Sequence, residues 1–227
     1  RAMEAAKVTV TGASAQQCAN EALAKFLDML NMHPITSAFS RSYEQSITCS
    51  GCKRQFTSPR DNHIWIYMPQ PVRPTANGCN ASEFTDALLH RNSEVDEYVC
   101  DDCKLKNKAC IQTTRLRAVG EIMVILFEQY LVKRVFPFPQ SFTLPRSVQV
   151  QTPDGKRSVT KGYYVYCLRA CMLHSGSMSS GHHWAVCERV DGVYSLNDTS
   201  VQRLAGRFTP SANVHTVVYE LDHIVEA

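Results

Sequence analysis

The chain has 227 residues, a formal net charge of +3, 44% hydrophobic residues and 20% charged residues. This composition is that of a folded globular protein, and it argues against a disordered tail, a histone-like nucleic-acid binder or a collagenous segment. The longest apolar run, 122–127, is far shorter than the ~20 residues of a membrane helix, and the N-terminus has no basic-then-apolar signal pattern. We therefore expect a soluble chain without a targeting segment.

The N-terminal half predicts two helices and one strand. Ser14 can cap a helix over residues 17–30, because apolar residues recur there on one face at helical spacing. The stretch 62–69 is typical of a strand. After a proline-rich turn, residues 82–89 predict a short helix.

From Cys103 onward the pattern changes to β structure. Short runs rich in β-branched and aromatic residues are separated by turn sequences such as Asp191-Gly192. The predicted strands cover residues 113–116, 121–127, 163–173, 184–189, 193–196 and 216–221. We therefore expect a helix, a β subdomain and then a mostly antiparallel sheet.

Ten cysteines are the unusual feature of this composition, and four of them form two Cys-x-x-Cys pairs, Cys49 with Cys52 and Cys100 with Cys103. Two intervening residues let both thiolates face one tetrahedral metal, so that two such pairs complete a closed, structural Zn²⁺ site. The alternative is two disulfides or free thiols, which the lack of a signal peptide disfavours. The other six cysteines have no such spacing and are expected to pack as small apolar residues.

A histidine pair in the C-terminal third is a candidate catalytic feature. His182 follows a Ser-Gly turn at the entry to a predicted strand, where an imidazole can act as a general base. The turn at Asp191-Gly192 could return the next strand beside it and bring Asn197 or Asp198 to the imidazole, fixing its tautomer. The alternative is that the histidines are surface loop residues and Asn-Asp is only a turn.

The chain resembles the ubiquitin-specific proteases, which are papain-like cysteine isopeptidases. Six segments carry the resemblance in the family's order. They are the Gln-Gln-Asp-Ala-x-Glu-Phe-Leu helix (16–23), the approaches to two zinc knuckles (35–49 and 98–104), the strand that usually ends Leu-Lys-Arg-Phe (122–130), the Gly-His-Tyr-x-Ala box (180–185) and the Phe-Asn/Asp-Asp-Ser-x-Val box (196–201).

The resemblance implies an α+β fold of papain-like ubiquitin-specific protease architecture. It would have a reduced helical thumb in residues 1–45, zinc-bearing β fingers in residues 46–115 and an antiparallel β palm in residues 116–227, all in one composite domain.

The resemblance also implies roles for site residues. His182 corresponds to the general base, Asn197 to the third member of the triad, and Asp198 to a neighbour that supports the imidazole or the oxyanion. His183 takes the aromatic position and competes for the role of base if the register shifts by one residue. Gly176 and Gly181 correspond to glycines near the channel that admits the Gly-Gly tail of ubiquitin.

The nucleophile is where the sequence departs from the family. The family's Asn-x-Gly-Asn-Thr-Cys-Tyr box lies well upstream of the Gln-Gln-Asp helix, and only 15 residues precede Gln16. Cys18 stands at the usual Asp position, near the start of a predicted helix whose dipole would lower a thiol pKa. It is either the nucleophile or an ordinary helix residue. The palm strand departs as well, with Glu128-Gln129-Tyr130 in place of the usual basic pair and Phe.

Two functions follow as expectations. One is a thiol protease that removes ubiquitin or a ubiquitin-like modifier from proteins through an acyl-enzyme, in a reducing compartment such as the cytoplasm or nucleus. The other is a catalytically inactive ubiquitin-binding scaffold that keeps fingers and palm. The expected cofactor is structural Zn²⁺. Nucleic acid is not an expected partner, since no basic stripe interleaved with aromatic residues is present. A membrane is not expected either, since the longest apolar run is too short to span one.

Overall fold

The computed structural model describes residues 19–30, 33–68, 74–75, 78–106, 109–127, 134–152, 155–157, 162–177 and 180–226. Its helices are α2 (Ala19–Leu30), α3 (His33–Phe39) and α4 (Ala81–Leu89). None of the helices in this described part combines the length and apolar character needed to cross a bilayer.

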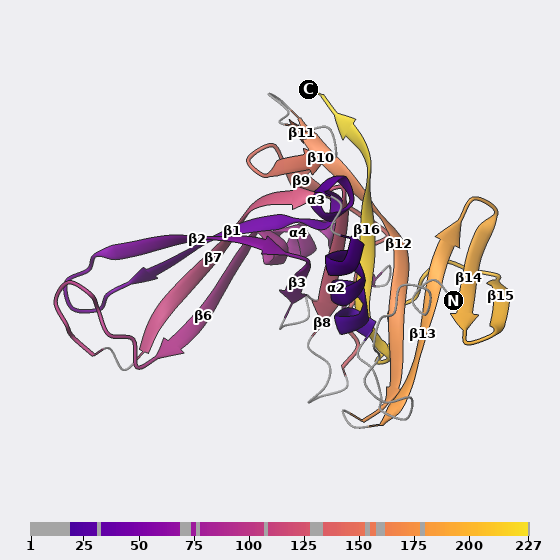
Figure 1. The fold of residues 1–227 in the computed structure, drawn as a ribbon, viewed down its shortest axis with the longest axis horizontal. Coiled ribbons are helices and arrows are strands. Elements are labelled where there is room, and N and C mark those ends of the chain that lie inside the picture. The colour runs from indigo at the N-terminus through magenta and orange to yellow at the C-terminus, as the bar shows by residue number, and fades with distance from the viewer. Residues whose placement is uncertain are drawn as a thin grey trace.

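A six-stranded sheet carries the cysteine pairs at its far end. Its strands are β1 (Arg41–Thr48), β2 (Gln55–His63), β6 (His90–Asp96), β7 (Ala109–Gly120), β10 (Gln149–Thr152) and β11 (Gly155–Arg157). The order is β11-β10-β7-β1-β2. Strand β7 pairs with β6 through residues 109–115 and with β10 through residues 118–120. Strands β1, β2, β6 and β7 project away from the rest of the molecule as a long arm (Figure 1).

An eight-stranded sheet forms the body. Its strands are β3 (Trp65–Met68), β8 (Ile122–Phe127), β9 (Ser141–Pro145), β12 (Tyr163–Gly176), β13 (Gly181–Arg189), β14 (Gly192–Asn197), β15 (Ser200–Leu204) and β16 (Val214–Val225). The order is β15-β14-β13-β12-β16-β8-β3, with β9 also pairing with β12. The short strands β4 (Pro74–Thr75) and β5 (Gly78–Cys79) form a separate pair.

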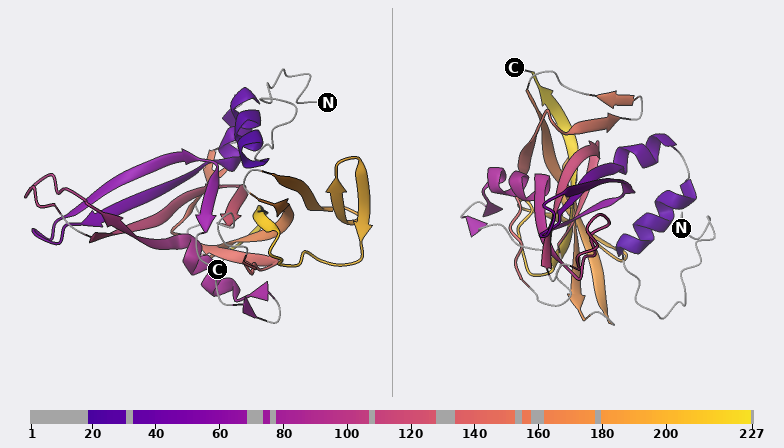
Figure 2. Two further views of the ribbon diagram at one scale, coloured as in Figure 1. Left: turned by 90° about the horizontal axis from the view of Figure 1, so that it is seen from below. Right: turned by 90° about the vertical axis from the view of Figure 1, so that its left-hand side faces the viewer.

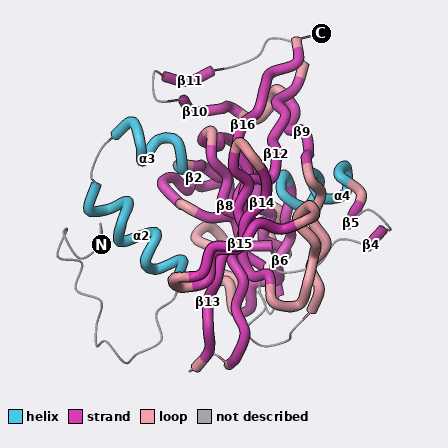
Figure 3. Tube along the Cα trace, turned by 90° about the vertical axis from the view of Figure 1, so that its right-hand side faces the viewer, coloured by secondary structure: helices cyan, strands magenta, loops and turns pink. Residues whose placement is uncertain are grey.

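The helices lie on opposite sides of the strands. Helices α2 and α3 are on one side and α4 on the other, as Figure 2 and Figure 3 show. Helix α4 begins where the Asn80 side chain accepts a hydrogen bond of 2.8 Å from the backbone N–H of Ser82, which satisfies one of the free donors of the first turn.

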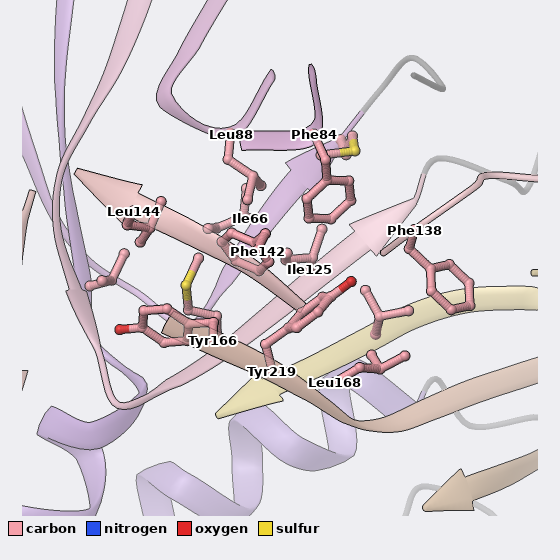
Figure 4. Close-up of a cluster of buried hydrophobic side chains, with 14 of the residues drawn as sticks. Ile66, Phe84, Leu88, Ile125, Phe138, Phe142, Leu144, Tyr166, Leu168 and Tyr219 are labelled. Atoms are coloured by element: carbon pink, nitrogen blue, oxygen red, sulfur yellow. The ribbon is translucent and has the colours of Figure 1, made fainter. Parts of the chain in front are cut away.

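The main core lies between α4 and the eight-stranded sheet. Phe84 and Leu88 are four positions apart on α4 and are both buried, as expected for the apolar face of a helix. The ring of Phe84 lies 5.3 Å from that of Phe142 and 5.9 Å from that of Tyr219 (Figure 4). This aromatic cluster fixes strands β9 and β16 against the helix.

A tight contact joins α3 to the strands. A Cβ atom at Gly120, the last residue of β7, would overlap the backbone carbonyl of Ala38 in α3. The carbonyl of Gly120 also accepts a hydrogen bond of 2.8 Å from the buried phenol of Tyr166. Gly120 therefore lets helix, long arm and body meet at one point.

Most of the predicted elements are confirmed. The helix over 82–89, the described part of the helix over 17–30 and the mostly antiparallel sheet are present, with parallel pairing only for β3 with β8 and β10 with β7 among the described strands. The single strand expected over 62–69 is wrong, because the chain changes sheets at Ile64: β2 ends at His63 and β3 begins at Trp65.

Candidate functional site

The four predicted cysteines meet at the far end of the long arm. The Sγ atoms of Cys49 and Cys103 lie 3.7 Å apart, as do those of Cys52 and Cys100. All four Sγ atoms lie within 4.8 Å of one another. Zn–S bonds of about 2.3 Å in a tetrahedron put sulfurs about 3.8 Å apart, so the spacing fits a metal ion of this kind.

The two cysteine pairs sit in turns of the same geometry. In the first, the N–H of Cys49 bonds the carbonyl of Arg54 and the N–H of Lys53 bonds the carbonyl of Cys49. In the second, Cys100 bonds Leu105 and Lys104 bonds Cys100 in the same way. Lys53 and Lys104 both have a positive φ, which closes each turn after its second cysteine.

The first turn also directs backbone donors at sulfur. The N–H of Gly51 lies 3.3 Å from the Sγ of Cys49. Hydrogen bonds from the backbone of Cys52 and of Gly51 lower the pKa of the Cys49 thiol to about 6. A thiolate is the metal-binding form, so these hydrogen bonds favour the ligand state of Cys49. An ion pair between Arg54 and Asp102 links the two turns beside the cluster.

A histidine and an asparagine meet at the open end of the β13–β14 hairpin in the eight-stranded sheet. The Nε2 atom of His182, at the start of β13, lies 2.5 Å from the Oδ1 atom of Asn197, at the end of β14. The β13–β14 hairpin places them together, with Ala185 opposite Leu196 and Arg189 opposite Gly192. The hairpin predicted at Asp191-Gly192 is therefore confirmed.

Asp198 lies farther from the imidazole. Its Oδ2 atom is 3.9 Å from the Nε2 of His182, and its side chain is largely exposed. The residue has a φ of 51°, in the left-handed region that Asp and Asn tolerate better than most residues. The ring of Trp184 stacks on that of His182 with centroids 6.1 Å apart, which limits the motion of the imidazole.

His183 turns away from Asn197 into a group of three imidazoles. Its ring lies 4.4 Å from that of His174, its cross-strand partner on β12, and 5.3 Å from that of His215 on β16. Burial, together with the neighbouring imidazoles of His183 and His174, lowers the pKa of His215 to about 4. The structure thus brings His182, and not His183, to the amide.

His174 and His215 were not among the predicted site residues. Their contact with His183 depends on the pairing of β12 with β13 and with β16. No local spacing in the sequence predicts this contact among the three histidines.

The two predicted substrate-channel glycines are cross-strand partners in one hairpin. Gly176 has a φ of 129°, and a Cβ there would overlap the backbone of Gly181 and Ser180. A Cβ at Gly181 would overlap the His174 ring. Close packing within the hairpin already requires glycine at both positions, and their part in admitting a substrate stays a prediction. Cys18 lies outside the described residues.

Comparison with solved structures identifies the class of fold. The SAGA Ubp8/Sgf11/Sus1/Sgf73 DUB module bound to ubiquitin aldehyde matches with a TM-score of 0.67 and 17% identity, covering 93% of this chain and 50% of that chain. The molecule thus has the fold of the ubiquitin-specific proteases. The family model described as ubiquitin carboxyl-terminal hydrolase matches residues 13–219. The chain belongs to this family.

Curated relatives agree with this assignment. Ubiquitin carboxyl-terminal hydrolase 21 of Mus musculus is 23% identical over 190 residues, which are 82% of this chain and 33% of the relative. Ubiquitin carboxyl-terminal hydrolase 11 of Schizosaccharomyces pombe is 23% identical over 176 residues, 75% of this chain and 47% of the relative. The chain thus spans about a third to a half of the length of these relatives.

Proposed function

We propose that this chain is part of a cysteine isopeptidase that removes ubiquitin or a ubiquitin-like modifier from proteins. The observation that carries the proposal is the contact of 2.5 Å between His182 and Asn197 at the open end of the β13–β14 hairpin, in a member of the ubiquitin carboxyl-terminal hydrolase family. The SAGA module of the same fold is bound to ubiquitin aldehyde, which supports ubiquitin as the modifier.

The contact with Asn197 favours one tautomer of the His182 imidazole. The Oδ1 of Asn197 can only accept a hydrogen bond, so Nε2 of His182 carries the proton and Nδ1 keeps a lone pair. Nδ1 can therefore take the proton of a thiol. Asn197 orients the ring and stabilises the imidazolium that forms, and Asp198, at 3.9 Å, adds a more distant negative charge.

The reaction then follows acyl-transfer chemistry. The thiolate attacks the carbonyl carbon of the isopeptide, and the C–N bond breaks as His182 gives its proton to the leaving lysine amine. Water, deprotonated by His182, attacks the thioester, releasing the modifier's carboxylate and regenerating the thiol. Cys18 is the candidate nucleophile within this chain, and the alternative is a cysteine elsewhere in the protein.

The four-cysteine cluster is proposed to hold structural Zn²⁺. Four thiolates at tetrahedral spacing leave no open position for a substrate or water, so the metal would hold the arm together rather than take part in the reaction. Metal binding requires the thiolate form of these cysteines, which suits a reducing compartment such as the cytoplasm or nucleus.

A ubiquitin probe with a C-terminal electrophile tests the proposed function. The full-length protein should be labelled at one thiol, and His182→Ala should abolish labelling. Labelling that survives Cys18→Ser would exclude Cys18 as the nucleophile. If the protein is not labelled but binds ubiquitin in calorimetry, it is a ubiquitin-binding scaffold and not an enzyme. If it is neither labelled nor binds ubiquitin, the proposal is refuted.

A further inference from the structure

A cavity lies between four strands of the six-stranded sheet (β1, β2, β6 and β7) and the elements α4 and β3. Its volume is about 130 Å³. Its polar lining comes from Tyr43, Gln45, Arg60, Tyr67, Arg91 and Thr114, and α4 and β3 supply the apolar remainder, including Trp65. No carboxylate is among its lining residues.

Two arginines in the lining are anchored, with donors to spare. The Nε of Arg60 donates to the Oε1 of Gln45 at 3.0 Å, and the Nη1 of Arg91 donates to the carbonyl of Tyr67 at 3.3 Å. A guanidinium has five N–H donors, so each keeps several for another acceptor. Across the described ranges, neither arginine forms an ion pair with a carboxylate.

A third arginine, Arg41, lies beside the cavity residue Tyr43. Arg41 is only 3% exposed, and its Nε and Nη2 atoms have no hydrogen-bond partner in the described structure. Burial lowers the pKa of Arg41 to about 10, while contact with the Tyr43 phenol opposes that shift. Arg41 and Arg91 both act on Tyr43, and Arg60 is its cross-strand partner. Three positive charges therefore surround one cavity residue.

One buried hydroxyl in the cavity lining lacks a hydrogen-bond partner among the described residues. Thr114 is 6% exposed, and its Oγ1 atom has no hydrogen-bond partner in the described structure. The residue stands in one cross-strand row with Gln45 and Arg91. Burying a hydroxyl without a hydrogen bond is unfavourable, and an oxygen-rich ligand in the cavity would supply the missing bond.

We propose that this cavity binds the phosphate group of a phosphomonoester. A phosphate dianion offers several acceptor oxygens to the forked donors of Arg60 and Arg91 and to the hydroxyl of Thr114, and it compensates the charge of Arg41. The aromatic residues Tyr43, Trp65 and Tyr67 form the wall beside the charged groups and fit an aromatic ester better than a bare ion. The inference does not rest on the proposed isopeptidase activity.

Titration calorimetry of the full-length protein with phenyl phosphate and with inorganic phosphate tests this site. We expect saturable binding at one site. Arg91→Gln and Thr114→Val should each weaken it at least about tenfold, since each removes a direct donor. Arg189→Gln, which removes the same charge from the exposed end of β13, should leave the affinity unchanged.

Comparing the affinities of the two compounds distinguishes an aromatic phosphomonoester from free phosphate as the ligand. Tighter binding of phenyl phosphate identifies an aromatic phosphomonoester, and equal binding identifies free phosphate as a sufficient ligand; both support the site. No saturable binding of either compound overturns the proposal. Equal weakening in Arg189→Gln and Arg91→Gln overturns it as well, because that result indicates only general charge attraction. Circular dichroism of each variant confirms that the fold is kept.

Discussion

The Nε2 atom of His182 lies 2.5 Å from the Oδ1 atom of Asn197, although the residues are 15 positions apart in the chain. The pairing of β13 with β14 brings the two residues together, and a turn between Asn197 and Ser200 connects β14 to β15. The same turn holds Asp198 farther away. Of these two neighbouring polar side chains, Asn197 is within hydrogen-bonding distance of the imidazole and Asp198 is not.

Replacing Asn197 should impair activity more than removing the charge of Asp198. Asn197→Ala removes the acceptor that fixes the His182 tautomer, and we expect kcat/KM for a ubiquitin-amide substrate to fall about hundredfold. Asp198→Asn keeps a residue that tolerates a positive φ and removes only a distant charge, so it should lose less than about tenfold. Larger losses in Asp198→Asn than in Asn197→Ala would reverse these roles.

Removing one cysteine of the cluster should release the metal. Cys49→Ser or Cys103→Ser leaves three thiolates, and metal analysis of the purified protein should show the loss of one Zn²⁺ per chain along with a lower Tm. Cys187→Ser, on the half-buried strand β13, is the matched control and should keep the metal. A cluster variant that retains a stoichiometric, tightly held Zn²⁺ would show that the four thiols are not its ligands.

Adding one methyl group at Gly120 should destabilise the fold. In Gly120→Ala the new Cβ meets the Ala38 backbone, which cannot yield as a flexible side chain could, so we expect a loss of about 2 kcal/mol or more in the free energy of unfolding. Gly206→Ala is the control, because a Cβ there has open space around it. Urea unfolding of both variants measures the difference, and equal stabilities would contradict the close approach of α3.

The buried imidazole of His215 should make the fold sensitive to acid. Its pKa is lowered from 6.5 to about 4, so between these values the unfolded chain binds a proton that the folded chain does not. The free energy of unfolding should therefore fall as the pH falls from about 6.5 to 4, by up to about 3 kcal/mol from this residue.

Urea unfolding across that pH range checks the effect. His215→Asn should flatten the dependence, whereas His90→Asn, which replaces an exposed histidine on β6, should leave it unchanged. A dependence equally steep in His215→Asn and in the parent protein would assign the acid sensitivity to other groups.

Features encoded by neighbouring residues could be predicted from the sequence. The cysteine pairs follow from a spacing of two residues, α4 from apolar residues four positions apart, and the hairpin at Asp191-Gly192 from its turn. Strands β6 and β15 could not be predicted, because their residues are mostly polar and exposed and take their conformation from the strands beside them. The three-imidazole group depends on cross-strand register, which no local pattern contains.

The two candidate sites differ in the sequence separation between the residues that each brings into contact. His182 and Asn197 are joined by closing 15 positions, whereas the sulfur contacts close 48 and 54 positions. Loop-closure entropy grows with the logarithm of length, so joining the cysteine pairs costs about 1 kcal/mol more. The contact between the imidazole and the amide therefore closes at a lower entropic cost than the contacts between the two cysteine pairs.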